Sequence, residues 1–202
     1  MLFRSAAILG RARAQPARAK TVLYASVGPE LFLYDVDADN AVLTKRGSVM
    51  LPAGVQYAWP HPSKRFFYVA SSNGQPGGGA VNQGDKHFAS AFRIDPATGT
   101  LAPHGQTLNL ASRPIHISVD GDGRFAMIAY NDPSGMTVHG IQADGTLGAA
   151  VPQAQKLDIG IYAHQIRTAP SNKSAVLVCR GNNPAGGKPE DPGSLKTFAF
   201  KD

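Results

Sequence analysis

The stretch GDGRFAMIAY at residues 121–130, followed by ADGTL at residues 143–147, contains the unit from which the rest of the chain is built. A tight Gly/Asp turn precedes an apolar run typical of a buried β-strand, and a second turn precedes another strand. The sequence repeats both signals. The first turn recurs as PSKRF at 62–66 and PSNKS at 170–174, and the second as DPATGTL at 95–101 and, more weakly, DNAVL at 39–43.

The spacing of the second turn gives the length of the repeat. Leu101 and Leu147 lie 46 residues apart, whereas Leu43 and Leu101 lie 58 apart. The excess of 12 residues matches a Gly-, Gln- and Asn-rich insertion at 74–85. A period of about 46 residues with four short strands is typical of one blade of a β-propeller. No segment of helical length shows a 3.6-residue apolar period.

We therefore expect an all-β fold, a β-propeller of four-stranded antiparallel blades over residues 21–202. Four partial or complete units fit into this range, and the chain stops directly after a strand. Because a propeller closes by pairing its last blade with its first, the sequence predicts an incomplete ring, the first part of a longer propeller. A complete four-bladed ring is the alternative.

The positive charge is concentrated at the start of the chain. The net charge is +6, but residues 1–20 hold five basic side chains and no acid, so the remainder carries 15 basic and 14 acidic groups. A nearly neutral body does not fit a nucleic-acid-binding protein, and no apolar run is long enough to cross a membrane. The Ala12-Arg13-Ala14 spacing makes residues 1–20 either the remnant of an export signal or a basic leader. The first predicts a periplasmic or secreted protein, the second a cytoplasmic one.

Metal and disulfide chemistry have little support in the sequence. Cys179 is the one cysteine, which excludes an internal disulfide framework and a multi-Cys zinc site. His61, His87, His104 and His139 fall in turns or outer strands, without a second ligand at metal spacing. We expect no metal and no cofactor.

Two histidines stand near the same point of the repeat. His116 and His164 lie at the start of strands that lead into the first turn, a point that Tyr57 occupies in the preceding copy. In a propeller these first strands line the central channel, so both side chains are candidates for general acid or base catalysis. The alternative for each is a histidine hydrogen-bonded within the channel wall.

Other polar residues flank these strands. Arg113 precedes one of them and Arg180 follows the next strand, so both are candidates to bind a carboxylate or phosphate. Arg167 lies three residues after His164, on the opposite face of a regular strand, and is a weaker candidate. Tyr130 and Asn131 end a strand and are candidate donors to a sugar hydroxyl or carbonyl. Rim solvation, turn capping and turn chemistry are the alternative roles.

Two segments resemble a known family. Residues 129–138 with the turn at 143–147 resemble the ANYNSGSVSV…DGSL stretch of the seven-bladed propeller lactonases, and Tyr162-Ala163-His164 resembles their HAH segment. The resemblance covers roughly residues 21–202 and implies about four of seven blades, with three more beyond Asp202. The chain departs from the family at Tyr162, where the family has histidine. We count Tyr162 among the candidate substrate-binding residues.

The resemblance implies an enzyme of the 6-phosphogluconolactonase or carboxymuconate-cyclising type. It would hydrolyse or form a lactone ring on a small acidic or sugar-derived substrate, with no metal and no cofactor, and would act as a monomer when full length. Nucleic acid and membrane are not expected as partners. A propeller that has lost its chemistry and serves as a ligand-binding or protein-interaction scaffold is the alternative function, and the tyrosine at position 162 favours it.

Overall fold

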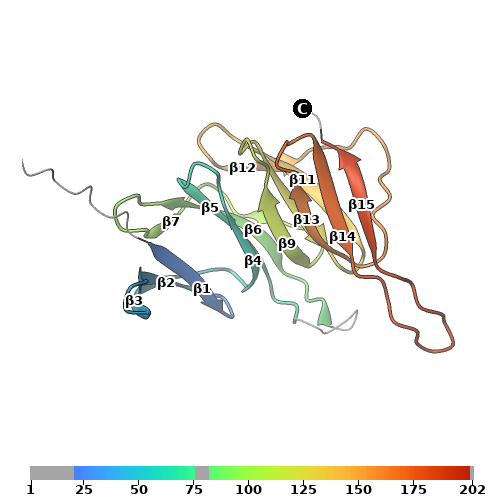
Figure 1. Cartoon of the computed structure of the whole chain (residues 1–202), viewed down its shortest axis with the longest axis horizontal. Helices are drawn as coiled ribbons and strands as arrows, with labels where there is room; N and C mark the ends of the chain where they lie inside the picture. The colour runs from blue at the N-terminus through green and yellow to red at the C-terminus, as the bar shows by residue number, and fades with distance from the viewer. Residues whose placement is uncertain (1–20, 76–81, 201–202) are drawn as a thin grey trace, which may run out of the picture.

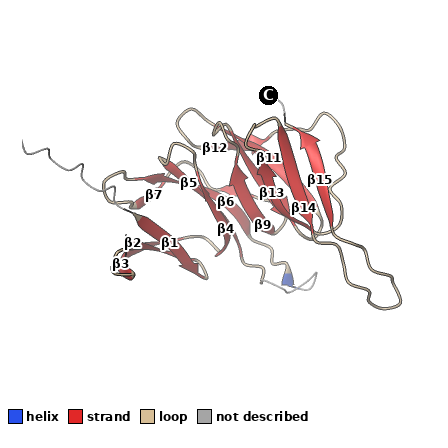
Figure 2. Ribbon diagram, viewed as in Figure 1, coloured by secondary structure: helices blue, strands red, loops and turns tan. Residues whose placement is uncertain are grey.

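The computed structural model describes residues 21–75 and 82–200, so the leader predicted at 1–20 lies outside the described residues. These residues form fifteen β-strands and no α-helix; the short blue piece in Figure 2 is a 3₁₀ turn at Asn82. The strands are β1 Val22–Val27, β2 Glu30–Asp37, β3 Val42–Met50, β4 Gly54–Pro60, β5 Phe66–Ser72, β6 His87–Ile94, β7 Leu101–Pro103, β8 Leu108–Asn109, β9 Pro114–Val119, β10 Phe125–Tyr130, β11 Gly135–Ile141, β12 Leu147–Ala150, β13 Ala163–Thr168, β14 Ser174–Cys179 and β15 Ser194–Ala199.

The strands form four antiparallel sheets in chain order. Sheet 1 is β1-β2-β3, sheet 2 is β4-β5-β6-β7 with β8 also paired to β6, sheet 3 is β9-β10-β11-β12, and sheet 4 is β13-β14-β15. Figure 1 shows them as an open fan, with sheet 1 at the blue end and sheet 4 at the red end. The described residues therefore form an arc of propeller blades and do not close into a ring.

Each pair of neighbouring sheets encloses its own apolar core. Alternation along β5 illustrates why, since successive side chains of a strand point to opposite faces. Phe67 and Val69 pack in the cluster shared with sheet 1, whereas Tyr68 and Ala70 pack in the cluster shared with sheet 3. A third cluster, which includes Met127 and Leu177, lies between sheets 3 and 4. A strand buried on both faces has a continuous run of apolar residues, and the run that follows the first turn of the repeat is of this kind.

The first turn of the repeat has the same geometry in three sheets. It follows β4, β9 and β13, and its third residue adopts a positive φ at Lys64, Gly123 and Asn172. In each copy the amide of that residue donates to the carbonyl three positions earlier, at 2.8, 3.1 and 2.8 Å. The three turns therefore allow the repeats to be aligned residue by residue.

The all-β propeller architecture predicted from the repeat is confirmed, with sheets of three to five strands. Sheets 1 and 4 hold three strands each among the described residues. The second turn of the repeat lies between β2 and β3, as it lies between β6 and β7 and between β11 and β12, so β1 corresponds to the second strand of the other sheets. The edge strands β4, β9 and β13 are the first strands of their sheets, and β9 packs against both of the others. We call these three the inner strands.

Candidate active site

A cavity of about 710 Å³ opens where the three inner strands begin, a volume within the range of small-molecule sites. It draws side chains from sheets 2, 3 and 4, and we call it the channel cavity. Its lining residues are Val55, Gln56, Tyr57, Gln83, Arg113, Ile115, His116, Asn131, Asp132, Tyr162, His164, Gln165 and Arg180. Six of the eight candidates predicted from the sequence are among them.

A β-bulge in each inner strand supplies one side chain to the cavity. The pairing register skips Gln56 in β4, Ile115 in β9 and His164 in β13. A bulged residue is left out of the ladder and its side chain is redirected, and all three skipped residues line the cavity. His164 therefore corresponds to Gln56 and Ile115 in the other copies.

His116 lies one position beyond the bulge and is buried. It corresponds to Tyr57 and Gln165, so the two candidate histidines are offset by one residue of the repeat. Its side chain is 2% exposed. The imidazole packs against the Tyr57 ring, with centroids 4.3 Å apart, and its Nδ1 accepts the amide of Ile166 at 3.5 Å.

This environment keeps the His116 imidazole neutral. Burial, and then the charges of Arg167 and His164, lower the pKa of His116 to about 4. Because Nδ1 acts as an acceptor, the proton resides on Nε2, which is buried and has no hydrogen-bond partner among the described residues. A base with so low a pKa accepts a proton poorly at neutral pH.

His164 differs in exposure and setting. Its side chain is exposed at the wall of the channel cavity. The bulge places it on the cavity side of β13, next to the Gln165 position that corresponds to His116. Of the two histidines, His164 is the one whose imidazole a small molecule and water can reach together.

The two cavity arginines are oriented by uncharged groups. Nε and Nη2 of Arg113 donate to Oε1 of Gln56 at 3.1 and 2.7 Å, and burial lowers the pKa of Arg113. The Arg180 guanidinium lies over the Tyr162 ring, 4.5 Å from its centroid. Within the described residues neither arginine has an ion pair with a carboxylate. The positive charge of each is therefore available to pair with an anionic ligand.

Two predicted residues are not brought to the cavity. Tyr130 is 6% exposed and belongs to the core between sheets 2 and 3, where its hydroxyl lies 2.8 Å from Thr137 Oγ1. The Arg167 guanidinium lies 4.8 Å from the centroid of the Trp59 ring, outside the cavity lining. Asn131 does line the cavity, and its Nδ2 donates to the carbonyl of Ala163 at 3.5 Å.

Sequence reasoning missed four polar residues of the cavity: Gln56, Gln83, Asp132 and Gln165. Gln56 and Gln165 stand within one position of the histidines in the repeat, so the alignment of the turns contains the signal that finds them. Gln83 belongs to the inserted segment and has no counterpart in the repeat. Asp132 follows β10 in a turn, where acidic residues are common for local reasons.

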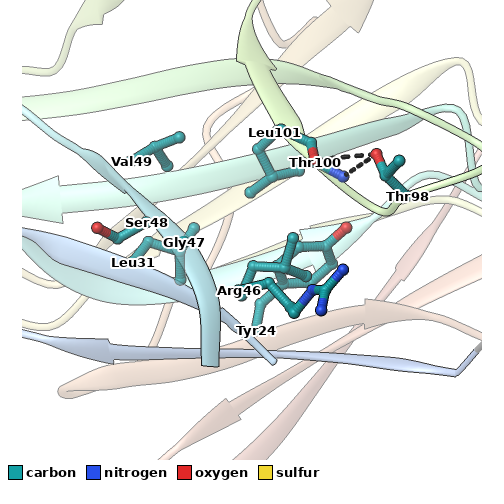
Figure 3. Close-up of a pocket in the computed structure, with 10 residues that line it drawn as sticks. Tyr24, Leu31, Arg46, Gly47, Ser48, Val49, Thr98, Thr100 and Leu101 are labelled. Atoms are coloured by element: carbon teal, nitrogen blue, oxygen red, sulfur yellow. Dashed lines mark hydrogen bonds between the residues drawn. The ribbon is translucent and has the colours of Figure 1, made fainter. Parts of the chain in front are cut away.

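A second cavity, of about 280 Å³, lies between sheets 1 and 2 (Figure 3). Its walls are mainly apolar, and Leu31, Val49 and Leu101 are among them. Arg46 and Tyr24 both line it, and Nε of Arg46 pairs with Asp35 at 3.2 Å. None of the described residues that line it is a histidine or a carboxylate. It therefore lacks the acid–base groups of the channel cavity.

Neither a metal cluster nor a membrane helix is found in the part of the chain that the structure describes. No three His, Cys, Asp or Glu side chains there are grouped so as to hold a metal ion. No helix of residues 21–75 or 82–200 is long and apolar enough to span a bilayer.

The arc of sheets and the cavity at the start of their inner strands define a propeller with a channel-end site. The profile of the family described as "Lactonase, 7-bladed beta-propeller" matches residues 23–183. The chain belongs to this family. A comparison with curated proteins finds no match to the sequence.

Solved structures show the same fold at low sequence identity. A periplasmic gluconolactonase of Pseudomonas aeruginosa is 20% identical, with a TM-score of 0.60 over 75% of this chain and 44% of its own. A provisionally assigned 6-phosphogluconolactonase of Bacteroides fragilis is 15% identical, with a TM-score of 0.62 over 82% of this chain and 47% of its own. The chain thus spans about half the length of the structures it resembles. These comparisons give no support to the ring-forming, muconate-type alternative.

Proposed function

We propose that the channel cavity hydrolyses a lactone ring on a small anionic or sugar-derived molecule, with 6-phosphogluconolactone as the first candidate. The observation that carries the proposal is the meeting of one exposed histidine, His164, with two arginines that have no carboxylate partner among the described residues, in one cavity of a lactonase-family propeller. Similarity to a gluconolactonase and to a provisionally assigned 6-phosphogluconolactonase supports the substrate class.

In the proposed mechanism His164 is the general base. Its imidazole takes a proton from a water molecule as the water oxygen attacks the lactone carbonyl carbon. The tetrahedral intermediate carries a negative oxygen, which the positive field of the cavity guanidiniums stabilises. When the ring C–O bond breaks, the leaving oxygen takes the proton from the His164 imidazolium, and an open hydroxy acid results.

Arg113 and Arg180 bind the anionic group of the substrate in this proposal. A guanidinium presents paired N–H donors that match a carboxylate or phosphate. Arg113 is already held by Gln56, which lowers the entropy cost of forming the contact. His116 supports the wall as a neutral packed imidazole.

The direct test is hydrolysis of 6-phosphogluconolactone and of glucono-δ-lactone, followed by acid release and corrected for spontaneous opening. We expect the phosphorylated lactone to react with the lower KM, and Arg180→Met to raise that KM while changing the KM for the neutral lactone little. Hydrolysis at the uncatalysed rate for both substrates would refute the proposal.

A non-catalytic ligand-binding propeller is the second candidate, and one observation favours it. No described residue donates or accepts a hydrogen bond at the His164 ring, whereas catalytic bases are usually oriented by a second group. Binding of 6-phosphogluconate without turnover of any lactone would decide for this alternative.

We further propose that the protein acts outside the cytoplasm and that, when full length, it is a monomer. The Ala12-Arg13-Ala14 spacing and the likeness to a periplasmic protein support the location. N-terminal sequencing of protein recovered from cell fractions tests it, and a mature chain that retains Met1 in the cytoplasm would contradict it.

A further inference from the structure

Tyr162 holds a backbone conformation that large side chains rarely adopt. Its φ is +52°, in the left-handed region that disfavours residues with a bulky side chain. Such a residue persists only where surrounding contacts hold it, and conformations of this kind gather at ligand sites. Tyr162 lines the channel cavity and lies two residues before the bulged His164.

The contacts that hold Tyr162 come from the segment after β14. The amide of Arg180 donates to the carbonyl of Tyr162 at 3.1 Å, and the amide of Gly181 donates to the carbonyl of Ile161 at 3.2 Å. The guanidinium of the same Arg180 lies over the tyrosine ring. Backbone and side chain of Arg180 therefore both engage Tyr162.

The two cavity arginines are held in different ways. Arg113 donates two of its hydrogen bonds to Gln56. Among the described residues, none accepts a hydrogen bond from the Arg180 guanidinium, which is held by its contact with the Tyr162 ring. A cation–π contact fixes a guanidinium through its face and leaves the N–H donors at its edge free.

We propose that Tyr162 is a positioning residue for Arg180: its ring holds the guanidinium at the cavity with every N–H donor free to bind the carboxylate or phosphate of the ligand. The inference rests on the proposed function in taking that ligand to be anionic. Tyrosine replaces the histidine of the family motif at this position, so the device distinguishes this chain from that motif. Left-handed backbone at residue 162 gives the ring its place over Arg180.

The test uses the 202-residue chain and 6-phosphogluconate as the probe, with inorganic phosphate beside it, in calorimetric titrations. Tyr162→Asn removes the ring but keeps a residue that tolerates positive φ. We expect it to weaken binding about 3- to 10-fold, the range that a lost cation–π contact corresponds to. Tyr162→Phe keeps the ring and is expected to bind within twofold of the native chain.

A double-mutant cycle separates positioning from a structural role. In the Arg180→Met background, Tyr162→Asn should weaken binding no further, because the ring acts through the guanidinium. Thermal unfolding of Tyr162→Asn should not occur at a lower temperature, since asparagine relieves backbone strain. A merely structural role would lower the unfolding temperature and weaken binding in both backgrounds.

Three results would overturn the inference: native-like binding by Tyr162→Asn, an equal loss in the Arg180→Met background, or no binding of either probe by the native chain. Tyr162-dependent binding of 6-phosphogluconate together with no lactone hydrolysis would support the inference and refute the proposed function. The two ideas can therefore fail separately.

Discussion

The inner strands β9 and β13 begin at the same cavity and carry the same bulge, yet their histidines have opposite surroundings. In β9 the bulged residue is Ile115, and His116 follows it into the packed space between Tyr57 and sheet 4. In β13 the bulged residue is His164 itself, which is exposed. One residue of offset at a bulge decides whether an imidazole is a buried neutral group or an accessible one.

The largest expected effect is on turnover. His164→Gln should lower kcat for 6-phosphogluconolactone by about 10²-fold or more, the scale of a lost general base. His116→Gln should lower it less than tenfold, because a neutral buried imidazole is not the base. Steady-state kinetics of both variants check this, with His104→Gln, outside the cavity, as the control. A larger loss in His116→Gln than in His164→Gln would reverse the comparison.

The second effect is on stability at acid pH. His116 has a folded-state pKa of about 4, against about 6.5 in an unfolded chain, so between these values only the unfolded state binds the proton. The free energy of unfolding should therefore fall as pH falls from about 6.5 to 4, by up to about 3 kcal/mol from this group. Urea unfolding across this range measures it.

His116→Gln is the matched variant for that measurement. It cannot titrate, so its stability should depend less steeply on pH than that of the native chain. His87 and His139, whose pKa values burial also lowers, should supply the remaining slope. An unchanged slope in His116→Gln would show that His116 is not buried in its neutral form.

Much of the fold could be predicted from the sequence because recognisable turn motifs mark the boundaries between the strands of each repeat. The turns ending at Lys64, Gly123 and Asn172 are local, so residue types at fixed spacing reveal them and the strands that follow. The grouping of Arg113, Arg180 and the histidines also follows, since each lies at an end of an inner strand or its neighbour. Because the turn motifs recur, residues at equivalent positions of different repeats can be predicted to lie close together in the folded propeller.

Features that depend on pairing or packing between strands could not be predicted from the sequence. A bulge arises from the register between two strands, so the exposure of His164 at the skipped position and the burial of His116 just beyond it appear only when β9 and β13 are paired with β10 and β14. The contact of Arg167 with Trp59 joins β13 to β4, far apart in the chain. The burial of Tyr130 depends in the same way on sheet 2 packing against sheet 3.

A third prediction concerns the turns that follow β9 and β13. Asn172 Nδ2 donates to Asp120 at 2.9 Å and to Asp122 at 3.0 Å, and its Oδ1 accepts the amide of Gly121 at 2.9 Å. Asn172→Gly keeps the positive φ but removes these contacts, and should cost about 1–2 kcal/mol of unfolding free energy. Equilibrium urea unfolding measures the difference. A change below about 0.3 kcal/mol would mean that the two turns are not coupled.

The smallest expected effect concerns the bulge residue of β4. Gln56→Leu leaves Arg113 without its hydrogen-bonding partner, so the guanidinium loses its fixed orientation. KM for the phosphorylated lactone should rise about threefold to fivefold with kcat little changed, as for one lost positioning hydrogen bond. Gln106→Leu, an exposed position outside the cavity, is the control. A fall in kcat with unchanged KM would instead place Gln56 in the chemical step.

The difference between the two inner strands is tested most directly by nuclear magnetic resonance of the histidine rings as pH is lowered. Imidazole nitrogen shifts report protonation and tautomer for each ring. The account predicts that His116 keeps its neutral Nε2–H form from pH 8 down to about pH 5, because its pKa is about 4. Protonation of His116 with a midpoint at or above the ordinary histidine value of about 6.5, or a proton on Nδ1, would contradict it.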